Sequence, residues 1–300
     1  MPEMRTKEET AGDSAHSSAK RASVEKILRH VTEVSTLPHV ALRVLEVARD
    51  PNSSAGDLRV IVEGDPSLSA RVLRCVNSAA YGLRVEITSL QQAISYLGFN
   101  QIRNLAITAS VSEVFRSEEA IATYRRTDLW RHMVSVGVCA RLIASRQRLS
   151  NFEEAFLAGL LHDIGIVLED QHCHEAFREI LPGLVDGGSL TEAEQQHLGF
   201  DHTTLGNRIA ESWRFPPAVC AGIRFHHMSQ NYRGPHAPLV RCVEIANWIC
   251  TLKGITSVGR QMVAVPMEAL QAGRLGKEDI KVLAADLDHE ISLNRQLFNL

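Results

Sequence analysis

The stretch AGLLHDIG, residues 158–165, places a histidine next to an aspartate inside an apolar run. A carboxylate in a protein core costs roughly several kcal/mol unless a partner compensates its charge. His162 and Asp163 therefore need partner groups from elsewhere in the chain. Because the flanking residues are apolar, we expect the two side chains to lie inside a helical core rather than on its surface.

Histidines in three other segments are candidate partners. His132 lies in LWRHMVSVGV, His202 lies in LGFDHTTLG, and the pair His226-His227 follows a Phe215-Pro216-Pro217 break. Neutral imidazoles combined with a carboxylate suit first-row metals such as iron, manganese or zinc, and a carboxylate can bridge two ions. We therefore predict a pocket for one or two divalent metal ions. Its six candidate ligands are His132, His162, Asp163, His202, His226 and His227.

Each of these residues also has a plain structural interpretation. A single histidine is more often a core or surface residue than a ligand. Asp201, beside His202, fits a helix N-cap, and Asp128, four residues before His132, fits another. The ordered series of histidines on separate helices favours the shared pocket. Four other histidines follow no such pattern, and we assign them to the surface: His172, His174, His197 and His236.

The composition favours an all-α fold. Hydrophobic residues make up 45% of the 300 residues, which is enough to bury a substantial core. Aromatic residues are only 5%, and the aliphatic residues recur at three-residue and four-residue spacing rather than alternating. The chain is therefore expected to fold as packed helices.

Helix start and stop signals fall into two groups. In the first group we expect helices after Pro38, from Ser53 or Ser54, from Asp65-Pro66 to Tyr81-Gly82, from Thr88 or Ser89 to Gly98, and from Asn100 to Phe115. A linker is expected near 117–127. In the second group we expect helices at 128–147, 152–170, 173–184, 191–197, 203–213, 216–228 and 239–252, followed by short C-terminal helices.

Charge and cysteine content restrict the function classes. Lys plus Arg (32) nearly balances Asp plus Glu (35), so the net charge of -3 offers no overall attraction to nucleic acid or to an anionic membrane. The six cysteines form no CxxC pair and are typical of reduced thiols in a cytoplasmic protein. The N-terminus is polar, and no run of 18 apolar residues exists. We expect a cytoplasmic protein that neither spans a membrane nor is exported.

Nucleic acid is not an expected partner. Arg59, Arg71 and Arg74 recur in a region that resembles a helix-turn-helix pair. They alternate with acidic residues, however, and no aromatic residues are interleaved with them. These arginines therefore give no continuous basic face.

The histidine series in its order and spacing resembles the metal-ligand series of the HD superfamily of phosphohydrolases, in particular its HD-GYP branch. The N-terminal half is similar to HDOD proteins, whose name stands for HD-related output domain. The matching stretches are LPHVALRVLEVARDP, DPSLSARVLRCVNSAAYG, ITSLQQAISYLGFNQIRNLAIT, EQQHLGFDH and NRIAESWRFPPAV. The resemblance covers about residues 24–250. It implies a multi-helix HD-type bundle preceded by an N-terminal helical subdomain.

The expected organisation follows from this resemblance. A disordered tail at 1–22 is rich in Ser, Ala, Lys and Glu and cannot bury enough apolar surface to fold. The other expected parts are an N-terminal helical subdomain at 23–117, an HD-type helical subdomain at 118–254 and a C-terminal helical extension at 255–300.

Two departures separate this chain from the catalytic relatives. HD-GYP phosphodiesterases continue with Ile-Gly-Lys after the HD pair, and the lysine helps to hold substrate phosphate; this chain has Ile164-Gly165-Ile166. The relatives supply a last aspartate ligand in an Ala-Asp context, whereas this chain has Ala246-Asn247, and the GYP motif is not found. A neutral amide weakens the attraction for divalent ions. The candidate replacements for the missing lysine are Arg131, Arg224 and Arg241.

The resemblance leads to two hypotheses about function. The first is a non-catalytic regulatory or scaffold module of bacterial signal transduction that receives its signal from a partner signalling protein or a small-molecule ligand. The groove between the N-terminal helices and the HD-type bundle is the expected binding place. The alternative is a metal-dependent phosphohydrolase that acts on a nucleotide or a cyclic dinucleotide.

Overall fold

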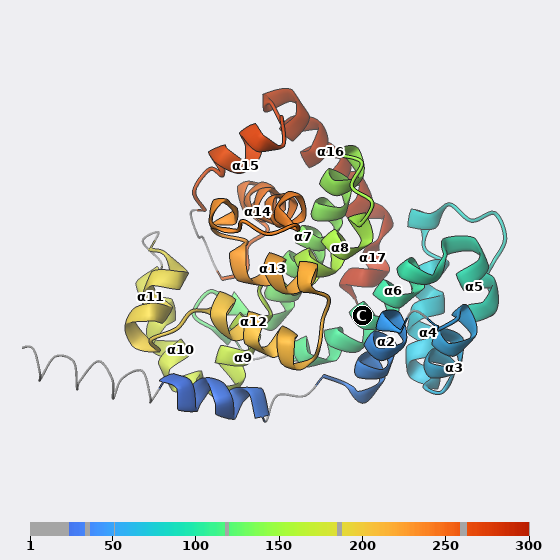
Figure 1. Cartoon of the computed structure of the whole chain (residues 1–300), viewed down its shortest axis with the longest axis horizontal. Coiled ribbons are helices and arrows are strands. Elements are labelled where there is room, and N and C mark those ends of the chain that lie inside the picture. The colour runs from blue at the N-terminus through green and yellow to red at the C-terminus, as the bar shows by residue number, and fades with distance from the viewer. Residues whose placement is uncertain are drawn as a thin grey trace, which may run out of the picture.

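The computed structural model describes residues 24–33, 37–50, 52–117, 120–184, 188–258 and 263–299. Within these ranges the regular secondary structure is helical apart from one hairpin of two short strands (Figure 1). The predicted all-α class is therefore confirmed. The expected tail at 1–22 lies outside the described residues.

All but the last of the N-terminal helices begin where the sequence signals predict. Residues 24–33 are helical, and the next elements are α2 (His39–Arg49), α3 (Ala55–Glu63), α4 (Pro66–Val76), α5 (Leu90–Leu97) and α6 (Phe99–Val111), with 3-10 turns at Ala79–Tyr81 and Ser112–Phe115. The Ser54 side chain accepts from the Asp57 N–H, and the Asp65 side chain accepts from the Leu68 N–H. Both contacts satisfy N–H groups that a helix start leaves free.

The second group contains the bundle and the C-terminal helices. Its elements are β1 (Ala120–Ile121), β2 (Tyr124–Arg125), α7 (Arg126–Arg146), α8 (Phe152–Leu161), α9 (Ile164–His172), α10 (His174–Ile180), α11 (Leu190–His197), α12 (His202–Ser212), α13 (Pro217–Phe225), α14 (Ala237–Leu252), α15 (Met267–Ala272), α16 (Lys277–Leu293) and α17 (Arg295–Phe298), with 3-10 turns at Leu181–Leu184 and Ser229–Asn231.

Several boundaries differ from the sequence expectation, and three of them have a plain physical reason. The expected helix 152–170 is two helices, because the chain leaves helical geometry at Asp163, between α8 and α9. The linker forms the β1–β2 hairpin, so α7 begins at Arg126, and Asp128 lies in its first turn rather than at its N-cap. Helix α6 begins at Phe99, not after Asn100, because Gly98 ends α5 with a positive φ of 82° and directly precedes α6.

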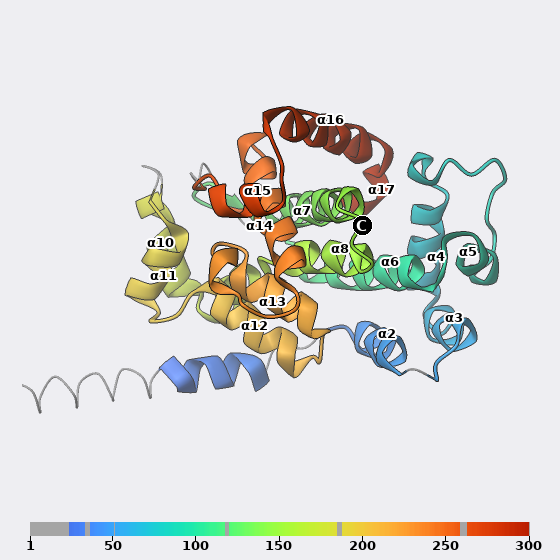
Figure 2. The ribbon, with the colours of Figure 1, turned by 45° about the horizontal axis from the view of Figure 1, so that its top comes forward.

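Helices α7 and α8 form the centre of the bundle and cross at two glycines. A Cβ on Gly159 would lie 2.8 Å from the Gly137 Cα, so the two backbones meet more closely than any side chain would allow. Helix α14 packs on both helices, and α13 packs on α8. Figures 1 and 2 place α2–α6 at one end of this centre and α10–α11 at the other.

Two features of the described residues bear on membranes and nucleic acids as partners. None of the helices in the described ranges is long and apolar enough to cross a membrane. Of the arginines considered for nucleic acid binding, Arg71 is buried and its Nη1 lies 2.8 Å from Glu113 Oε1. Arg59 lies beside Glu63, at 3.7 Å. These arginines therefore do not form an open basic face.

Candidate metal centre

The structure brings all six predicted ligands together. His132 comes from α7, His162 and Asp163 from the break between α8 and α9, and His202 from the first turn of α12; the remaining two follow the end of α13. Five are buried, and His227 is half-buried. Their potential ligand atoms form two groups, each within 4.8 Å, that share the aspartate: His132, His162 and Asp163; and Asp163, His202, His226 and His227.

The two carboxylate oxygens of Asp163 face different groups. Oδ2 lies 3.2 Å from the Nε2 of His162 and 3.6 Å from the Nε2 of His132. Oδ1 lies 3.4 Å from the Nε2 of His202 and 3.3 Å from the Nε2 of His226. A carboxylate in this position can contribute one oxygen to each of two ions.

The break between α8 and α9 depends on Gly165. A Cβ at this position would lie 2.0 Å from the His202 carbonyl oxygen, because the start of α9 packs directly on the start of α12. This contact holds His202 close to the preceding Asp163. The glycine of the AGLLHDIG stretch is therefore required by backbone packing at the site.

Backbone carbonyls determine which ring nitrogen carries the hydrogen in three of the histidines. The Nδ1 of His132 lies 2.7 Å from the Ile255 oxygen, and the Nδ1 of His162 lies 2.7 Å from the Gly159 oxygen. The Nδ1 of His226 lies 2.9 Å from the Ile223 oxygen. A carbonyl can only accept, so each Nδ1 must donate. In the neutral ring, Nε2 is then left with a lone pair that points into the site.

The Nε2 atoms of the five histidines lie close together around Asp163. The distance is 3.3 Å between His132 and His162, 3.4 Å between His202 and His226, and 3.1 Å between His202 and His227. Several lone pairs and a carboxylate in one buried space repel one another unless a cation lies between them. The residues present therefore fit one or two divalent metal ions.

Burial keeps most of these imidazoles in the form that binds metal. It lowers the pKa of His132 and of His226 to about 4, and it lowers the pKa of His227 well below its ordinary value. Burial alone would raise the pKa of Asp163, but positive charge on the surrounding histidines, His162 first, and the hydrogen bonds that they donate when protonated hold it well below the usual range. A bound cation would supply this charge instead and leave an ionised carboxylate among neutral imidazoles, which are the protonation states of metal ligands.

Glu194 on α11 orients His202. Its Oε2 lies 2.8 Å from the His202 Nδ1 and accepts from the His202 backbone N–H at 2.9 Å. Burial would lower the pKa of His202, but the charge and hydrogen bond of Glu194 raise it to about 9. A carboxylate behind a ligating histidine orients the ring and makes it a stronger ligand. This role of Glu194 was not predicted from the sequence, because an eight-residue separation follows no local rule.

A second carboxyl group lies behind Glu194. Glu169 on α9 is fully buried, and neither of its oxygens has a hydrogen-bond donor among the described residues. Burial, together with the charge of Glu194, raises the pKa of Glu169 well above its ordinary value. This raised pKa favours the neutral acid form of Glu169, whose hydroxyl can donate to Glu194.

Two amide substitutions should separate the roles of these carboxyl groups. We expect Glu194→Gln to weaken metal binding by roughly 10-fold to 100-fold, because His202 loses its charged partner. Glu169→Gln replaces a neutral acid by a neutral amide that can still donate, so the affinity should stay within about threefold of wild type. Competition with a chromophoric chelator measures both affinities. A loss in Glu169→Gln as large as that in Glu194→Gln would show that Glu169 carries a charge.

The space beside the carboxylate is small. Asn247 is buried and lines a space of about 10 Å³ together with Asp163, His202 and His227. A volume of this size holds about one water molecule. Ile166, at the position of the missing lysine, is fully buried in the core. Among the described residues, the position that holds the lysine in the relatives therefore carries no positive charge.

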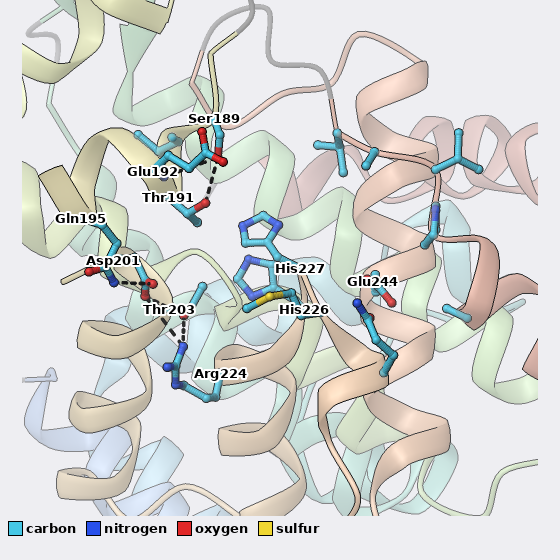
Figure 3. A pocket seen from close by; sticks show the side chains of 18 of the residues that line it. Ser189, Thr191, Glu192, Gln195, Asp201, Thr203, Arg224, His226, His227 and Glu244 are labelled. Atoms are coloured by element: carbon cyan, nitrogen blue, oxygen red, sulfur yellow. Dashed lines mark hydrogen bonds and ion pairs between the residues drawn. The ribbon is translucent and has the colours of Figure 1, made fainter.

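A larger pocket lies next to the histidines. It has a volume of about 780 Å³, and His226 and His227 form part of its wall (Figure 3). Of the three arginines proposed to replace the lysine, Arg224 lines this pocket, whereas Arg131 and Arg241 line neither it nor the smaller space. Arg224 donates to the Thr203 hydroxyl.

The expected binding groove between the N-terminal helices and the bundle holds a smaller cavity. Its volume is about 240 Å³, and Tyr81, Arg141 and Glu153 are among its lining residues. The large pocket instead lies between α11, α12, the end of α13, α14 and residues 263–269. The expected binding place therefore stays a prediction, and the larger pocket lies elsewhere because the chain after α14 forms a wall that the sequence does not predict.

Comparison with known proteins agrees with this architecture. The family model of the HDOD domain matches residues 34–229. A Treponema pallidum (strain Nichols) protein without an assigned function is 24% identical over 233 residues, which cover 74% of this chain and 43% of that protein. The chain thus spans less than half the length of this relative.

Two solved structures share the fold. An HDOD domain protein of unknown function from Geobacter sulfurreducens has a TM-score of 0.76 and is 25% identical, with 93% of this chain and 98% of that chain covered. A proposed phosphohydrolase from Shewanella amazonensis SB2B has a TM-score of 0.72 and is also 25% identical, with 91% and 97% covered.

Proposed function

The chain belongs to the HDOD domain family, and from this premise we propose that it is a non-catalytic regulatory or scaffold module of bacterial signal transduction. Its HD-type pocket would hold one or two divalent ions of iron, manganese or zinc. The observation that carries the metal proposal is the set of facing Nε2 atoms around Asp163. Iron, manganese and zinc all accept mixed imidazole and carboxylate ligands.

Three features argue against hydrolysis of a phosphate ester. The position of the phosphate-binding lysine is Ile166, which is buried. The last carboxylate is replaced by Asn247, which removes a negative charge from the site. The space between Asn247 and Asp163 has room for about one water molecule, so a phosphate group does not fit there without movement of the walls.

The alternative function is a metal-dependent phosphohydrolase. Its specific support is the complete set of six candidate ligands, together with the fold shared with the Shewanella protein. In that case Arg224 would have to leave Thr203 to contact a substrate phosphate.

One experiment separates the two functions. The purified protein is stripped and then reloaded with manganese, iron or zinc, and its metal content is measured. Turnover is assayed with p-nitrophenyl phosphate, nucleotides and cyclic dinucleotides, with Asp163→Ala as the control. The regulatory function predicts about one or two ions per chain and no turnover above that of the variant. Turnover that Asp163→Ala abolishes would establish the phosphohydrolase instead.

Restoring the last carboxylate should strengthen the site. In Asn247→Asp the new charge faces Asp163 across the small space. We expect the weaker-bound ion to gain roughly tenfold in affinity. Calorimetric titration of stripped protein with manganese measures this gain. Asn299→Asp, at an exposed position, is the control for the added charge. Equal affinities in wild type and Asn247→Asp would mean that Asn247 does not face an ion.

The cellular setting is part of the proposal. All six cysteines are free. Thiols stay reduced in the cytoplasm, which we take as the compartment of this protein. Its partner would be a signalling protein or a small-molecule ligand.

A further inference from the structure

The large pocket beside the histidines has two acidic walls. Figure 3 shows Glu192 on one side, with Ser189 and Thr191, and Glu244 on the opposite side, with His226 and His227 between them. The volume of about 780 Å³ lies within the range of small-molecule sites. The pocket is therefore large enough for an organic ligand that reaches from one wall to the other.

The lining carries more negative than positive charge. Its carboxylates are Glu192, Asp201, Glu244 and Glu268, and Arg224 is the one Lys or Arg among the described lining residues. Arg224 is already bonded to Thr203, and its Nη1 lies 3.8 Å from Asp201. A concave surface with one excess sign of charge concentrates ligands of the opposite sign. The pocket thus disfavours a nucleotide or cyclic dinucleotide and favours a cation.

The carboxylates of the pocket differ in exposure and in the hydrogen bonds that they already accept. Asp201 caps α12 and also accepts from Gln195, so it serves the fold. Glu192 and Glu268 are exposed at the rim. Glu244 is only 7% exposed and accepts from the Ser229 hydroxyl, and burial raises its pKa. An ammonium group in the pocket would supply the positive charge that buried Glu244 lacks.

The pocket also has apolar surface that no other part of the described chain covers. Met228, Val265 and Met267 line it and are 45%, 51% and 55% exposed. A ligand that lies across this surface should therefore have charged ends and an aliphatic middle.

We propose that this pocket binds an aliphatic diamine or polyamine, with one ammonium group at Glu192, another at Glu244, and the methylene chain against Met228 and the two histidines. This inference rests on the proposed regulatory function, because it supplies the small-molecule signal that such a module needs. Since His226 and His227 belong to the candidate metal group, the ligand would lie directly over the metal centre.

The test is calorimetric titration of the full chain with spermidine, 1,4-diaminobutane and butylamine. Protein stripped of metal is used first, so that no amine can coordinate an ion. We expect both polyvalent amines to bind, and butylamine to bind roughly tenfold more weakly because it reaches one wall only. Glu192→Gln and Glu244→Gln should each lower the affinity for spermidine by roughly fivefold to tenfold. Glu46→Gln, which makes the same charge change at an exposed position on α2, should bind as wild type.

Two results would overturn the proposal. One is equal binding of spermidine by wild type and both pocket variants. The other is tighter binding of cyclic di-GMP or inorganic phosphate than of any amine. The same titrations on metal-loaded protein keep this inference apart from the proposed function. A chain that takes up no metal but binds spermidine through Glu192 and Glu244 contradicts the metal centre alone, whereas a chain that holds metal without binding amines contradicts the pocket assignment alone.

Discussion

Gly165→Ala is expected to destabilise the protein severely. The added Cβ would lie 2.0 Å from the carbonyl oxygen of His202, and both groups belong to backbone that cannot rotate away. Relief requires that α9 and α12 separate, which also moves His202 away from Asp163. Overpacking of this kind costs about 3 kcal/mol or more. For a chain of this size the melting temperature should fall by roughly 6 to 12 °C, measured by circular dichroism.

The matched control is Gly183→Ala. Among the described residues, no atom lies within 4 Å of a Cβ at Gly183, so the same chemical change meets none of the close contacts found at Gly165. We expect its melting temperature to stay within about 2 °C of wild type. If Gly165→Ala melted like Gly183→Ala and still bound metal, the close packing of α9 on α12 would be wrong.

Asp163→Asn should remove most of the metal affinity while preserving the shape of the side chain. Both ligand groups share this carboxylate, so one substitution removes the negative charge from each. The amide nitrogen would also point a donor at a position where a cation belongs. We expect metal binding to weaken by roughly 100-fold or more.

Thermal denaturation with and without metal measures this loss. At a metal concentration of about 100 times the wild-type Kd, bound metal stabilises the fold by about 2.7 kcal/mol. Wild type should therefore melt several degrees higher in metal than in chelator, and Asp163→Asn should show almost no difference. Asp50→Asn, at an exposed position after α2, should keep the wild-type difference. An undiminished metal effect in Asp163→Asn would exclude the carboxylate as a ligand.

Local rules predicted much of the N-terminal half. Ser54 and Asp65 cap their helices as expected, because a capping side chain and its helix start lie within a few residues of each other. The break at the His-Asp pair was not predicted, because residues 152–170 continue the helical pattern without a proline. That break depends on contacts between Gly165 and His202, which are far apart in the sequence.

The candidate ligands could be predicted from the sequence, but the carboxyl groups behind them could not. The order of the histidines resembles a known family, and the structure brings all of them to one place. Glu194 lies in the polar stretch LTEAEQQH, which indicates a surface residue. In the structure it is fully buried against His202. Glu169 gives no signal in the sequence either. The large pocket also depends on long-range packing, because residues 263–269 return to close it beside α11 and α13.

The most direct test of the metal centre is an anomalous difference map. Crystals of the full chain are soaked in manganese, iron or zinc, and data are collected on both sides of the absorption edge of the metal. The site predicts one or two peaks about 2.0 to 2.3 Å from the histidine Nε2 atoms and next to the Asp163 oxygens. Crystals soaked in each metal that show no anomalous peak among these side chains would contradict it.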